Sequence, residues 1–391
     1  ERQYTGHGVV IGLDRQRNLA YALRWSGSEP GGAAELSALR LNQATTLTEF
    51  SQALSSWRMP AVDVIATNRD NDIRQQRAAL QPRRRGFDGR YPVDGRGAAN
   101  EWRGWVSHPS EGSGWDAAAV SNDDPFRTSR ISSLLWPGHQ RSAKVFAVDT
   151  LAELQRDVHA DDADVMIAGI ERIVDLAPGL SEARRRLIAW DRNMRADSQD
   201  AQLFDEWRRQ FQRRMAGATG SPALADELAA RVDYVRVLMS QDGGLTAAIV
   251  PTNVPQALAQ SLTTALDVVQ GSDANARWSV EHRVSFEHPL ALSDEAKRRF
   301  NVGPFPADGA EHTVQALADR GRTGAGFRAV FDAGDWDRAQ VVSAPGQSGW
   351  PDSAHYRDMA ALWAAGRMIP LPFSAAAVQR AAKATLTLQP R

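Results

Sequence analysis

The chain has 391 residues, 42% of them hydrophobic and 24% charged, so it can bury a core larger than that of one small domain. Lys and Arg number 46 against 47 Asp and Glu, a formal net charge of -1, and this balance argues against a general nucleic-acid binder. The absence of cysteine excludes disulfides, thiolate metal sites and cysteine nucleophiles.

The N-terminal part of the chain has the pattern of short strands joined by turns. Two apolar runs, at residues 7–12 and 19–25, are separated by a polar turn, which predicts a β-hairpin. Residues 36–57 place apolar side chains at helical spacing, with Thr48 as the expected cap. Residues 82–116 are rich in Gly, Arg, Pro and Trp and predict a long irregular segment.

The middle part is rich in Ala, Leu, Arg and Asp and predicts a layer of helices. Between residues 197 and 215, apolar side chains recur at steps that place them on one face of a helix: Leu203, Phe204, Trp207, Phe211 and Met215. Glycine and proline pairs divide this part into separate helices.

The C-terminal part returns to strand-like runs, at residues 283–286, 327–331 and 340–343, and closes with an amphipathic helix over 356–366. Because sheet-forming ends flank a helical middle, the predicted fold class is α+β. The expected division is a sheet-forming part over 1–149, which contains a polar loop at 119–127 that could act as an oxyanion loop, a helical layer over 150–275, and returning strands with a C-terminal helix over 276–391.

Several familiar catalytic patterns are missing. The run Gly346-Gln347-Ser348-Gly349 lacks the Gly-x-Ser-x-Gly spacing of a nucleophile elbow, so a self-contained serine hydrolase of that type is not supported. No Gly-x-Gly-x-x-Gly run stands between a strand and a helix, which argues against nucleotide binding.

Two groups of residues could suggest a metal ion. His282 and His288 are six positions apart, but a metal would need a third ligand, so structural hydrogen bonding is the preferred interpretation. An acidic run could suggest calcium, although it lacks the glycine and the distal glutamate of a calcium loop. Its members are His159, Asp161, Asp162 and Asp164. For this run we prefer a solvated helix start.

A polar constellation at residues 119–127 offers catalytic chemistry. Asn122 can aim an amide N–H at a developing oxyanion, and Arg127 can brace that geometry or bind a carboxylate. The run Asn122-Asp123-Asp124-Pro125 is also an ordinary turn and helix-cap signal. On spacing alone the turn is the preferred interpretation.

A family resemblance supplies further context. The tail contains Ala344-Pro345-Gly346-Gln347-Ser348-Gly349, then Pro351, Ser353, His355, Tyr356 and Asp358, and later Pro370-Leu371-Pro372-Phe373-Ser374. Other matching runs are Asn100-Glu101-Trp102-Arg103-Gly104-Trp105, Trp190-Asp191, Phe286-Glu287-His288-Pro289-Leu290 and Phe300-Asn301-x-Gly303-Pro304-Phe305-Pro306. With these motifs the chain resembles the penicillin acylase family of N-terminal-nucleophile hydrolases, in the C-terminal part of the β-chain.

This resemblance implies a four-layer αββα sandwich with an added helical layer. It also implies a precursor that is cleaved so that a serine becomes the N-terminus of the β-chain. The hydroxyl of that serine attacks an amide carbonyl while its own α-amino group acts as base. The nucleophile is then expected outside this chain.

Two residues of this chain match functional positions of the family. Asn122 matches the side-chain oxyanion donor, and Arg127 matches the arginine that organises the site around it. Asp123 stands where members usually carry a second asparagine. Its carboxylate would oppose charge developing on the oxyanion unless Arg127 or a water screens it.

The expected reaction is hydrolysis of an N-acyl amide, such as a β-lactam side chain or an acyl-homoserine lactone. The alternative is a catalytically inactive acylase-fold binding protein. The resemblance implies autoproteolytic processing of a zymogen and a hetero-oligomer. Its other members would be the α-chain and the N-terminal part of the β-chain of the same precursor, and the ligand a small-molecule N-acyl amide.

The remaining expectations concern cofactors, partners and location. No cofactor is assigned, and the structural calcium of the family would fall in segments outside this chain. No apolar run reaches the ~18 residues of a membrane span, and nucleic acid is not an expected partner. A periplasmic or secreted location is implied. The N-terminus begins at Glu1 without an apolar leader, which suggests a chain cut from a longer one.

Overall fold

The computed structural model describes residues 2–15, 18–29, 39–70, 72–83, 94–96, 105–107, 111–113, 124–136, 146–174, 176–218, 225, 229, 234–239, 253–273 and 277–389. The chain forms two compact units, Glu1–Ser121 and Asn122–Arg391. The three-part division expected from the sequence remains a prediction.

The N-terminal unit begins with the predicted hairpin. Strands β2 (Gly8–Asp14) and β3 (Leu19–Leu23) pair antiparallel, and β1 (Tyr4–Thr5) adds to the other side of β2. Gly8 has a φ of 113°, and a Cβ there would collide with the Leu23 carbonyl oxygen. The hairpin therefore needs glycine at its first position.

A second sheet of this unit is built around β5 (Ile73–Ala78). β4 (Val62–Thr67) pairs with one side of β5 and β8 (Glu111–Ser113) with the other, both antiparallel. β6 (Leu80–Pro82) pairs with β7 (Trp105–Ser107). The expectation of an irregular segment over 82–116 is therefore wrong where β7 and β8 lie. Backbone pairing with a neighbouring strand decided these strands, and local composition does not report it.

The helix expected over 36–57 is interrupted: residues 39–41 are helical, residues 42–46 are not, and residues 36–38 lie outside the described residues. Helix α2 covers Leu47–Leu54, and Thr46, not Thr48, is its N-cap: the Thr46 hydroxyl accepts a hydrogen bond from the Glu49 amide at 3.1 Å. The Glu49 carboxylate turns back to accept from the Thr45 amide at 2.8 Å. A glutamate three residues after Thr46 is the sequence signal that favours that threonine as the cap.

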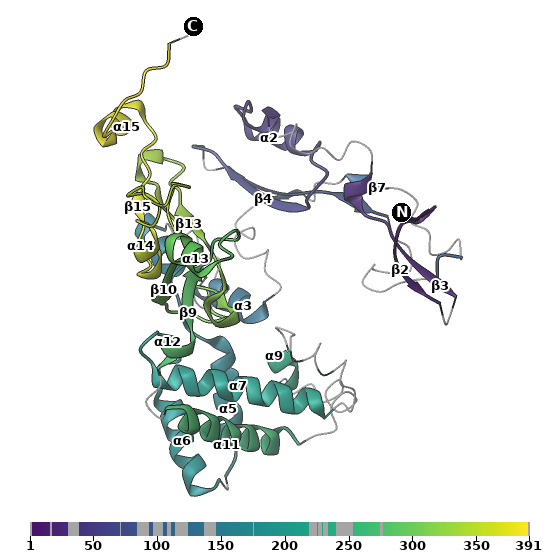
Figure 1. The fold of residues 1–391 in the computed structure, drawn as a ribbon, viewed down its shortest axis with the longest axis vertical. Coiled ribbons are helices and arrows are strands. Elements are labelled where there is room, and N and C mark those ends of the chain that lie inside the picture. Colours follow the sequence, from purple (N-terminus) through teal and green to yellow (C-terminus); the bar gives the residue numbers. More distant parts are fainter. Residues whose placement is uncertain are drawn as a thin grey trace. The chain divides into compact units, whose positions relative to one another are not determined.

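The C-terminal unit contains the predicted helical layer (Figure 1). Its main elements are α5 (Asp161–Glu171), α6 (Pro178–Ala189), α7 (Gln199–Gly217), α9 (Tyr234–Met239) and α11 (Val254–Asp273). The predicted apolar stripe of α7 is buried; Trp207 is fully enclosed and donates its indole N–H to the Leu258 carbonyl at 3.0 Å. Helices α7 and α11 pack side by side. The helical prediction is confirmed.

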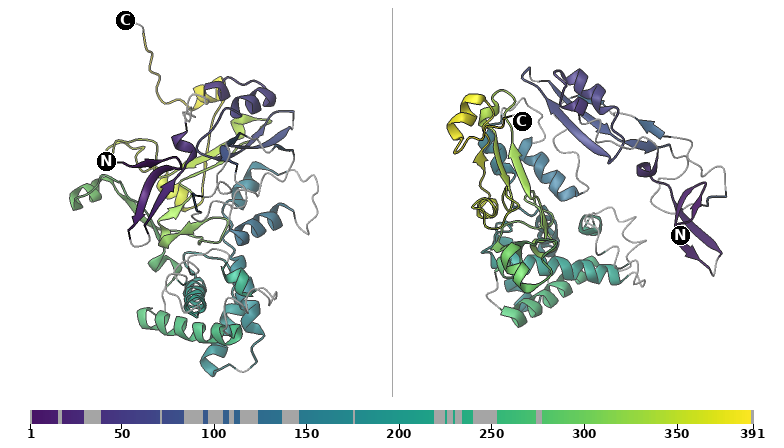
Figure 2. Two further views of the ribbon diagram at one scale, coloured as in Figure 1. Left: turned by 90° about the vertical axis from the view of Figure 1, so that its right-hand side faces the viewer. Right: turned by 45° about the horizontal axis from the view of Figure 1, so that its top comes forward.

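Short antiparallel strands adjoin this layer. The pairs are β9 (Arg283–Phe286) with β10 (Val302–Pro306), β11 (Leu317–Ala318) with β12 (Thr323–Gly324), and β13 (Phe327–Val330) with β14 (Gln340–Ser343), which also pairs with β15 (Ile369–Pro370). Figure 2 shows the light-green to yellow strands at one end of the helical layer. The three predicted strand runs are confirmed.

Short helices complete the unit. They are α3 (Pro125–Leu135), α4 (Val148–Leu154), α12 (Trp278–Glu281), α13 (Asp294–Phe300), α14 (Ala360–Ala364) and α15 (Ala375–Ala381). Helix α14 lies inside the predicted 356–366 helix but is shorter. Trp363 packs into a second core with Val284, Leu317 and Val342. Among the described helices, none is long and apolar enough to span a bilayer.

Candidate active site

The site is built around the N-terminal end of helix α3. Asp124 caps this helix: its Oδ1 accepts hydrogen bonds from the amides of Phe126 at 2.9 Å and Arg127 at 3.2 Å. Pro125 takes the first helical position, where no amide hydrogen is needed. The helix-cap interpretation of this run is thus correct for Asp124. Asn122 and Asp123 lie outside the described residues.

Arg127 connects the first turn of α3 to the loop over residues 307–317. Its Nε donates to the Thr313 carbonyl at 3.0 Å and its Nη2 to the Glu311 carbonyl at 2.6 Å. The same guanidinium lies 3.8 Å from Asp124 Oδ2. Arg127 therefore holds two backbone carbonyls of the 307–317 loop against the first turn of α3.

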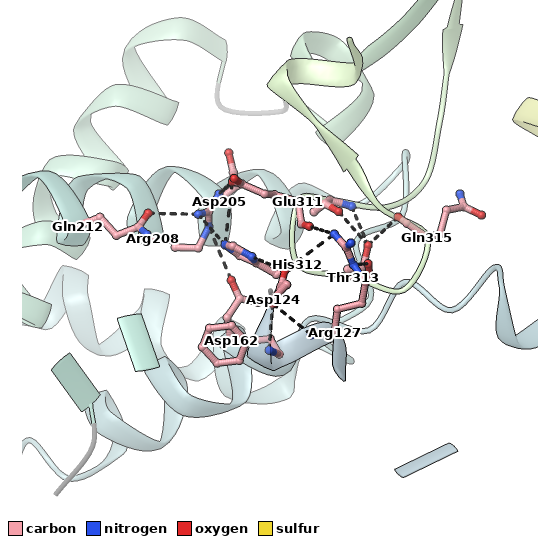
Figure 3. Close-up of polar contacts among 12 residues, drawn as sticks. Asp124, Arg127, Asp162, Asp205, Arg208, Gln212, Glu311, His312, Thr313 and Gln315 are labelled. Carbon is pink, nitrogen blue, oxygen red and sulfur yellow. Dashed lines mark hydrogen bonds and ion pairs between the residues drawn. The ribbon is translucent and has the colours of Figure 1, made fainter. Parts of the chain in front are cut away.

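His312, in the same loop, reaches the other oxygen of the cap. The imidazole is buried, with Nδ1 2.9 Å from Asp124 Oδ2 and Nε2 3.3 Å from Arg208 Nη1 (Figure 3). Its ring centroid lies 5.7 Å from that of Phe126. His312 joins helix α3 to helix α7, and no pattern in the sequence marks it for that role.

Arg208 of α7 is the centre of a buried charged cluster. Its Nη2 donates to Asp205 Oδ1 at 2.8 Å, its Nη1 donates to Gln212 Oε1 at 3.1 Å, and its Nε lies 3.6 Å from Asp162 Oδ2. Glu311 Oε2 is 3.6 Å from the same Nη2. Three carboxylates from three segments thus surround one buried guanidinium.

Burial and charge act in opposite directions on this cluster. Burial alone would lower the pKa of Arg208, but the neighbouring carboxylates of Asp205 and Asp162 raise it. Burial raises the pKa of Asp162. For Asp205, burial would also raise the pKa, but the guanidiniums of Arg208 and Arg209 outweigh it and hold the pKa low. Asp205 is therefore held in its charged form.

The acidic run at the start of α5 is not a uniformly solvated helix start. Asp162 is 2% exposed and faces Arg208, because the helical period turns it inward, while Asp164, two positions on, is exposed. The ligand atoms of His159, Asp161 and Asp164 lie within 4.8 Å of one another. Asp164 is already paired with Arg192 at 2.7 Å and His159 at 3.0 Å. Three donors, one of them an imidazole, fall short of the six to eight oxygens calcium takes.

A second arginine of α3 forms a bidentate ion pair. Arg130 donates its Nε and Nη2 to the two carboxylate oxygens of Asp157, at 2.9 and 2.6 Å. The Asp157 carbonyl in turn accepts from the Gln315 amide at 2.9 Å. This pair also ties α3 to the 307–317 loop. No local pattern marks this pair, because the two residues lie 27 positions apart in the sequence.

His282 and His288 act as hydrogen-bonding residues of the fold. His282 donates from Nε2 to the Leu317 carbonyl at 3.0 Å, and His288 Nδ1 accepts from the Leu290 amide at 3.2 Å. Each ring also packs against an aromatic side chain, Trp278 and Phe300 respectively. The structural interpretation of both histidines agrees with these contacts.

Comparison with known proteins identifies the family of this chain. The family model for penicillin amidase matches residues 1–380. The chain belongs to the penicillin amidase family. A penicillin acylase 2 proenzyme from Pseudomonas sp. (strain SE83) is 28% identical over 418 residues, which cover 95% of this chain and 51% of that protein. The acyl-homoserine lactone acylase QuiP from Pseudomonas putida is 26% identical over 426 residues, covering 94% and 51%.

A solved structure shows the same fold. Thermostable penicillin G acylase from Alcaligenes faecalis aligns with a TM-score of 0.70 at 18% identity, covering 100% of this chain and 79% of that chain. This match confirms the predicted α+β fold class and the fold type of N-terminal-nucleophile hydrolases. The chain spans about half the length of the curated relatives it matches.

Proposed function

We propose that this chain is part of an acylase that hydrolyses N-acyl amides to a carboxylic acid and an amine. The observation that carries the proposal is the penicillin amidase match over residues 1–380. The names of two relatives, penicillin acylase and acyl-homoserine lactone acylase, suggest β-lactam side chains or acyl-homoserine lactones as substrates. Because the chain spans about half of those relatives, the activity belongs to a larger assembly.

The nucleophile of this assembly is an N-terminal serine supplied by a segment outside this sequence. Its hydroxyl oxygen adds to the amide carbonyl carbon, and its α-amino group takes the hydroxyl proton. The tetrahedral intermediate then collapses as the amine leaves with that proton. A water attacks the acyl-serine ester, which releases the carboxylic acid and restores the serine.

Asn122 donates a side-chain N–H to the oxygen on which negative charge develops. Such a donor helps only if it is held in place before the charge forms. Asn122 precedes Asp124, the N-cap of α3, by two positions. Asp124 accepts from the Arg127 amide, and the Arg127 guanidinium donates to the 307–317 loop, so this end of the helix is held in place. We assign Arg127 as a positioning residue, because its guanidinium is satisfied by two backbone carbonyls.

The partners are the α-chain and the N-terminal part of the β-chain, all cut from one precursor. The word "proenzyme" in the name of the Pseudomonas relative supports a processed precursor. Both relatives come from Pseudomonas, and we propose a periplasmic or secreted location from the resemblance to this family. If these segments assemble as proposed, this chain should purify together with other segments of its precursor.

The test is single-turnover and steady-state kinetics on the assembled, processed protein with penicillin G, an acyl-homoserine lactone and an N-acyl 4-nitroanilide. Asn122→Ala should lower the chemical step by about 10²–10³-fold with little change in substrate affinity. Asn68→Ala is the control and should leave turnover unchanged; Asn68 lies at an exposed turn, where its side-chain oxygen accepts from the Asp70 and Asp72 amides.

Two results would contradict the proposal. Binding of all three compounds without turnover would indicate an acylase-fold binding protein. Turnover that is unchanged in Asn122→Ala would remove the catalytic role of this chain, since a plain turn residue costs about 1 kcal/mol of stability and leaves chemistry alone.

A further inference from the structure

His312 is a buried link between the cap of helix α3 and the helical layer. The side chains of His312 and Asp124 are 4% and 5% exposed, so their contact is shielded from water. The two residues are 188 positions apart in the chain. A buried hydrogen bond of this kind holds two segments in one relative position, because breaking it leaves polar atoms without partners.

The partners of His312 determine where its proton lies. Arg208 Nη1 can only donate, so the imidazole Nε2 that faces it at 3.3 Å must accept. The ring proton is then on Nδ1, where it donates to Asp124 Oδ2 at 2.9 Å. Figure 3 shows the imidazole between the arginine and the carboxylate. The hydrogen-bond direction therefore runs from Arg208 through His312 to Asp124.

This bond leaves the Asp124 carboxylate little freedom to rotate. Oδ1 holds the amides of Phe126 and Arg127, while Oδ2 receives the proton of His312. A carboxylate held at both oxygens sets the direction in which the backbone enters the helix. Asn122 lies two residues before it in the sequence.

Hydrogen bonds anchor the 307–317 loop, which carries His312, to the helical layer. The Gly309 amide donates to the Met194 carbonyl at 2.7 Å, and the Trp278 indole donates to the Gly309 carbonyl at 3.0 Å. Asp308 Oδ1 accepts from the Ala196 amide at 2.7 Å. These bonds join the loop to the turn that precedes α7 and to α12. His312 therefore contacts Asp124 of α3 from a loop that is fixed to the helical layer.

We propose that His312 is a positioning residue for the oxyanion donor: its Nδ1–H bond to Asp124 orients the N-cap of helix α3, two residues after Asn122 in the sequence. The inference rests on the proposed function, because it needs Asn122 to be that donor. A misplacement of about 1 Å at a catalytic group can cost about 10²-fold in rate. His312 would therefore affect the rate of the chemical step without touching the substrate.

Two nearly isosteric substitutions separate the two ring nitrogens. The Asn side-chain nitrogen falls near the position of Nδ1, so His312→Asn keeps a donor for Asp124. The Gln side-chain nitrogen falls near Nε2, so His312→Gln points toward Arg208 and loses that donor. Both variants remove the ring and its packing against Phe126, so a difference between them reports on the bond to Asp124.

The experiment measures kcat and KM for an N-acyl 4-nitroanilide on the assembled protein, with hydrogen exchange of the peptide that contains the Phe126 and Arg127 amides. His312→Gln should lower kcat by about 10–100-fold with KM within about threefold, and should speed exchange at the cap. His312→Asn should stay within about threefold of wild type in both. His355→Asn is the matched control, since His355 Nδ1 also pairs with a carboxylate, Asp358, at 2.8 Å but is exposed.

Equal kcat in His312→Gln and wild type, or equal losses in the Asn and Gln variants, would overturn the inference. If His312→Gln does not assemble, Asp124→Ser takes its place, because serine keeps the helix cap but is too short to reach His312. Wild-type kcat in that variant would also overturn it, and a 10–100-fold loss would support it. A rate loss in Asn122→Ala alongside unaffected His312 variants would reject this inference alone, whereas an unaffected Asn122→Ala rejects the proposed function.

Discussion

Trp278 and His282 stack face to face, with ring centroids 4.0 Å apart and planes inclined by 21°. His282 is 4% exposed and donates its Nε2 proton to the Leu317 carbonyl at 3.0 Å. Burial lowers the pKa of this imidazole to about 4, from an ordinary value of 6.5. The carboxylate of Asp205 opposes the shift without cancelling it. His282 is therefore neutral in the folded protein at neutral pH.

Stability should fall with acid because of His282. Between pH 6.5 and about 4 the unfolded chain binds a proton that the folded chain does not, so the free energy of unfolding decreases as the pH drops through that range. The full effect is on the order of 3 kcal/mol at 1.36 kcal/mol per pKa unit.

Urea unfolding at a series of pH values measures this contribution. His282→Gln keeps a donor for Leu317 but cannot titrate, so its stability should change less between pH 6.5 and 4 than that of wild type. His355→Gln, at an exposed histidine, should keep the wild-type slope. Parallel curves for wild type and His282→Gln would show that another group causes the acid sensitivity.

The buried Arg208 cluster should contribute more to the free energy of unfolding than an exposed ion pair of the same unit does. Arg208→Met leaves the carboxylates of Asp205 and Asp162 buried without their main counter-charge, which should cost about 3–5 kcal/mol. Arg299→Met removes a pair with Asp352 at 2.9 Å whose side chains are 56% and 64% exposed, and should cost under about 1 kcal/mol.

Thermal or chemical unfolding of the two methionine variants compares these costs directly. Replacing Asp162 and Asp205 together with Asn in the Arg208→Met background should recover part of the loss, because the stranded charges are then gone. Similar small losses for Arg208→Met and Arg299→Met would mean that the buried cluster is hydrated and contributes little.

Gly309→Ala should disturb the loop that carries His312. Gly309 has a φ of 102°, and a Cβ there would collide with the Gln315 carbonyl oxygen. The substitution should cost more than about 1 kcal/mol and lower kcat as well, because it shifts the loop that holds Arg127 and His312 in place. Gly326→Ala, where a Cβ meets nothing within 4 Å, is the matched control.

Stability and kcat measured on both alanine variants test this coupling. A Gly309→Ala protein with reduced stability but wild-type kcat would show that the loop can move without affecting the chemical step.

Local sequence patterns determined much of the architecture. The hairpin of β2 and β3, the apolar stripe of α7, and the strands β9, β13 and β14 follow from the periodicity of apolar side chains, which depends only on neighbours in the chain. The C-terminal motifs were sufficient to indicate the penicillin acylase family and its fold. Thr46 as the cap of α2 could also have been found, from the glutamate three residues later.

The contacts of the candidate site were decided by tertiary structure. Asp124 and His312 lie 188 positions apart, and Arg208 and His312 lie 104 apart, so neither pair leaves a periodic signal. Asp162 shows the same limit, since its position in an acidic run favours water while the packing of α5 against the interior turns it toward Arg208. A polar side chain becomes a partner only when the fold removes water from both members of a pair, and that desolvation depends on how distant segments pack.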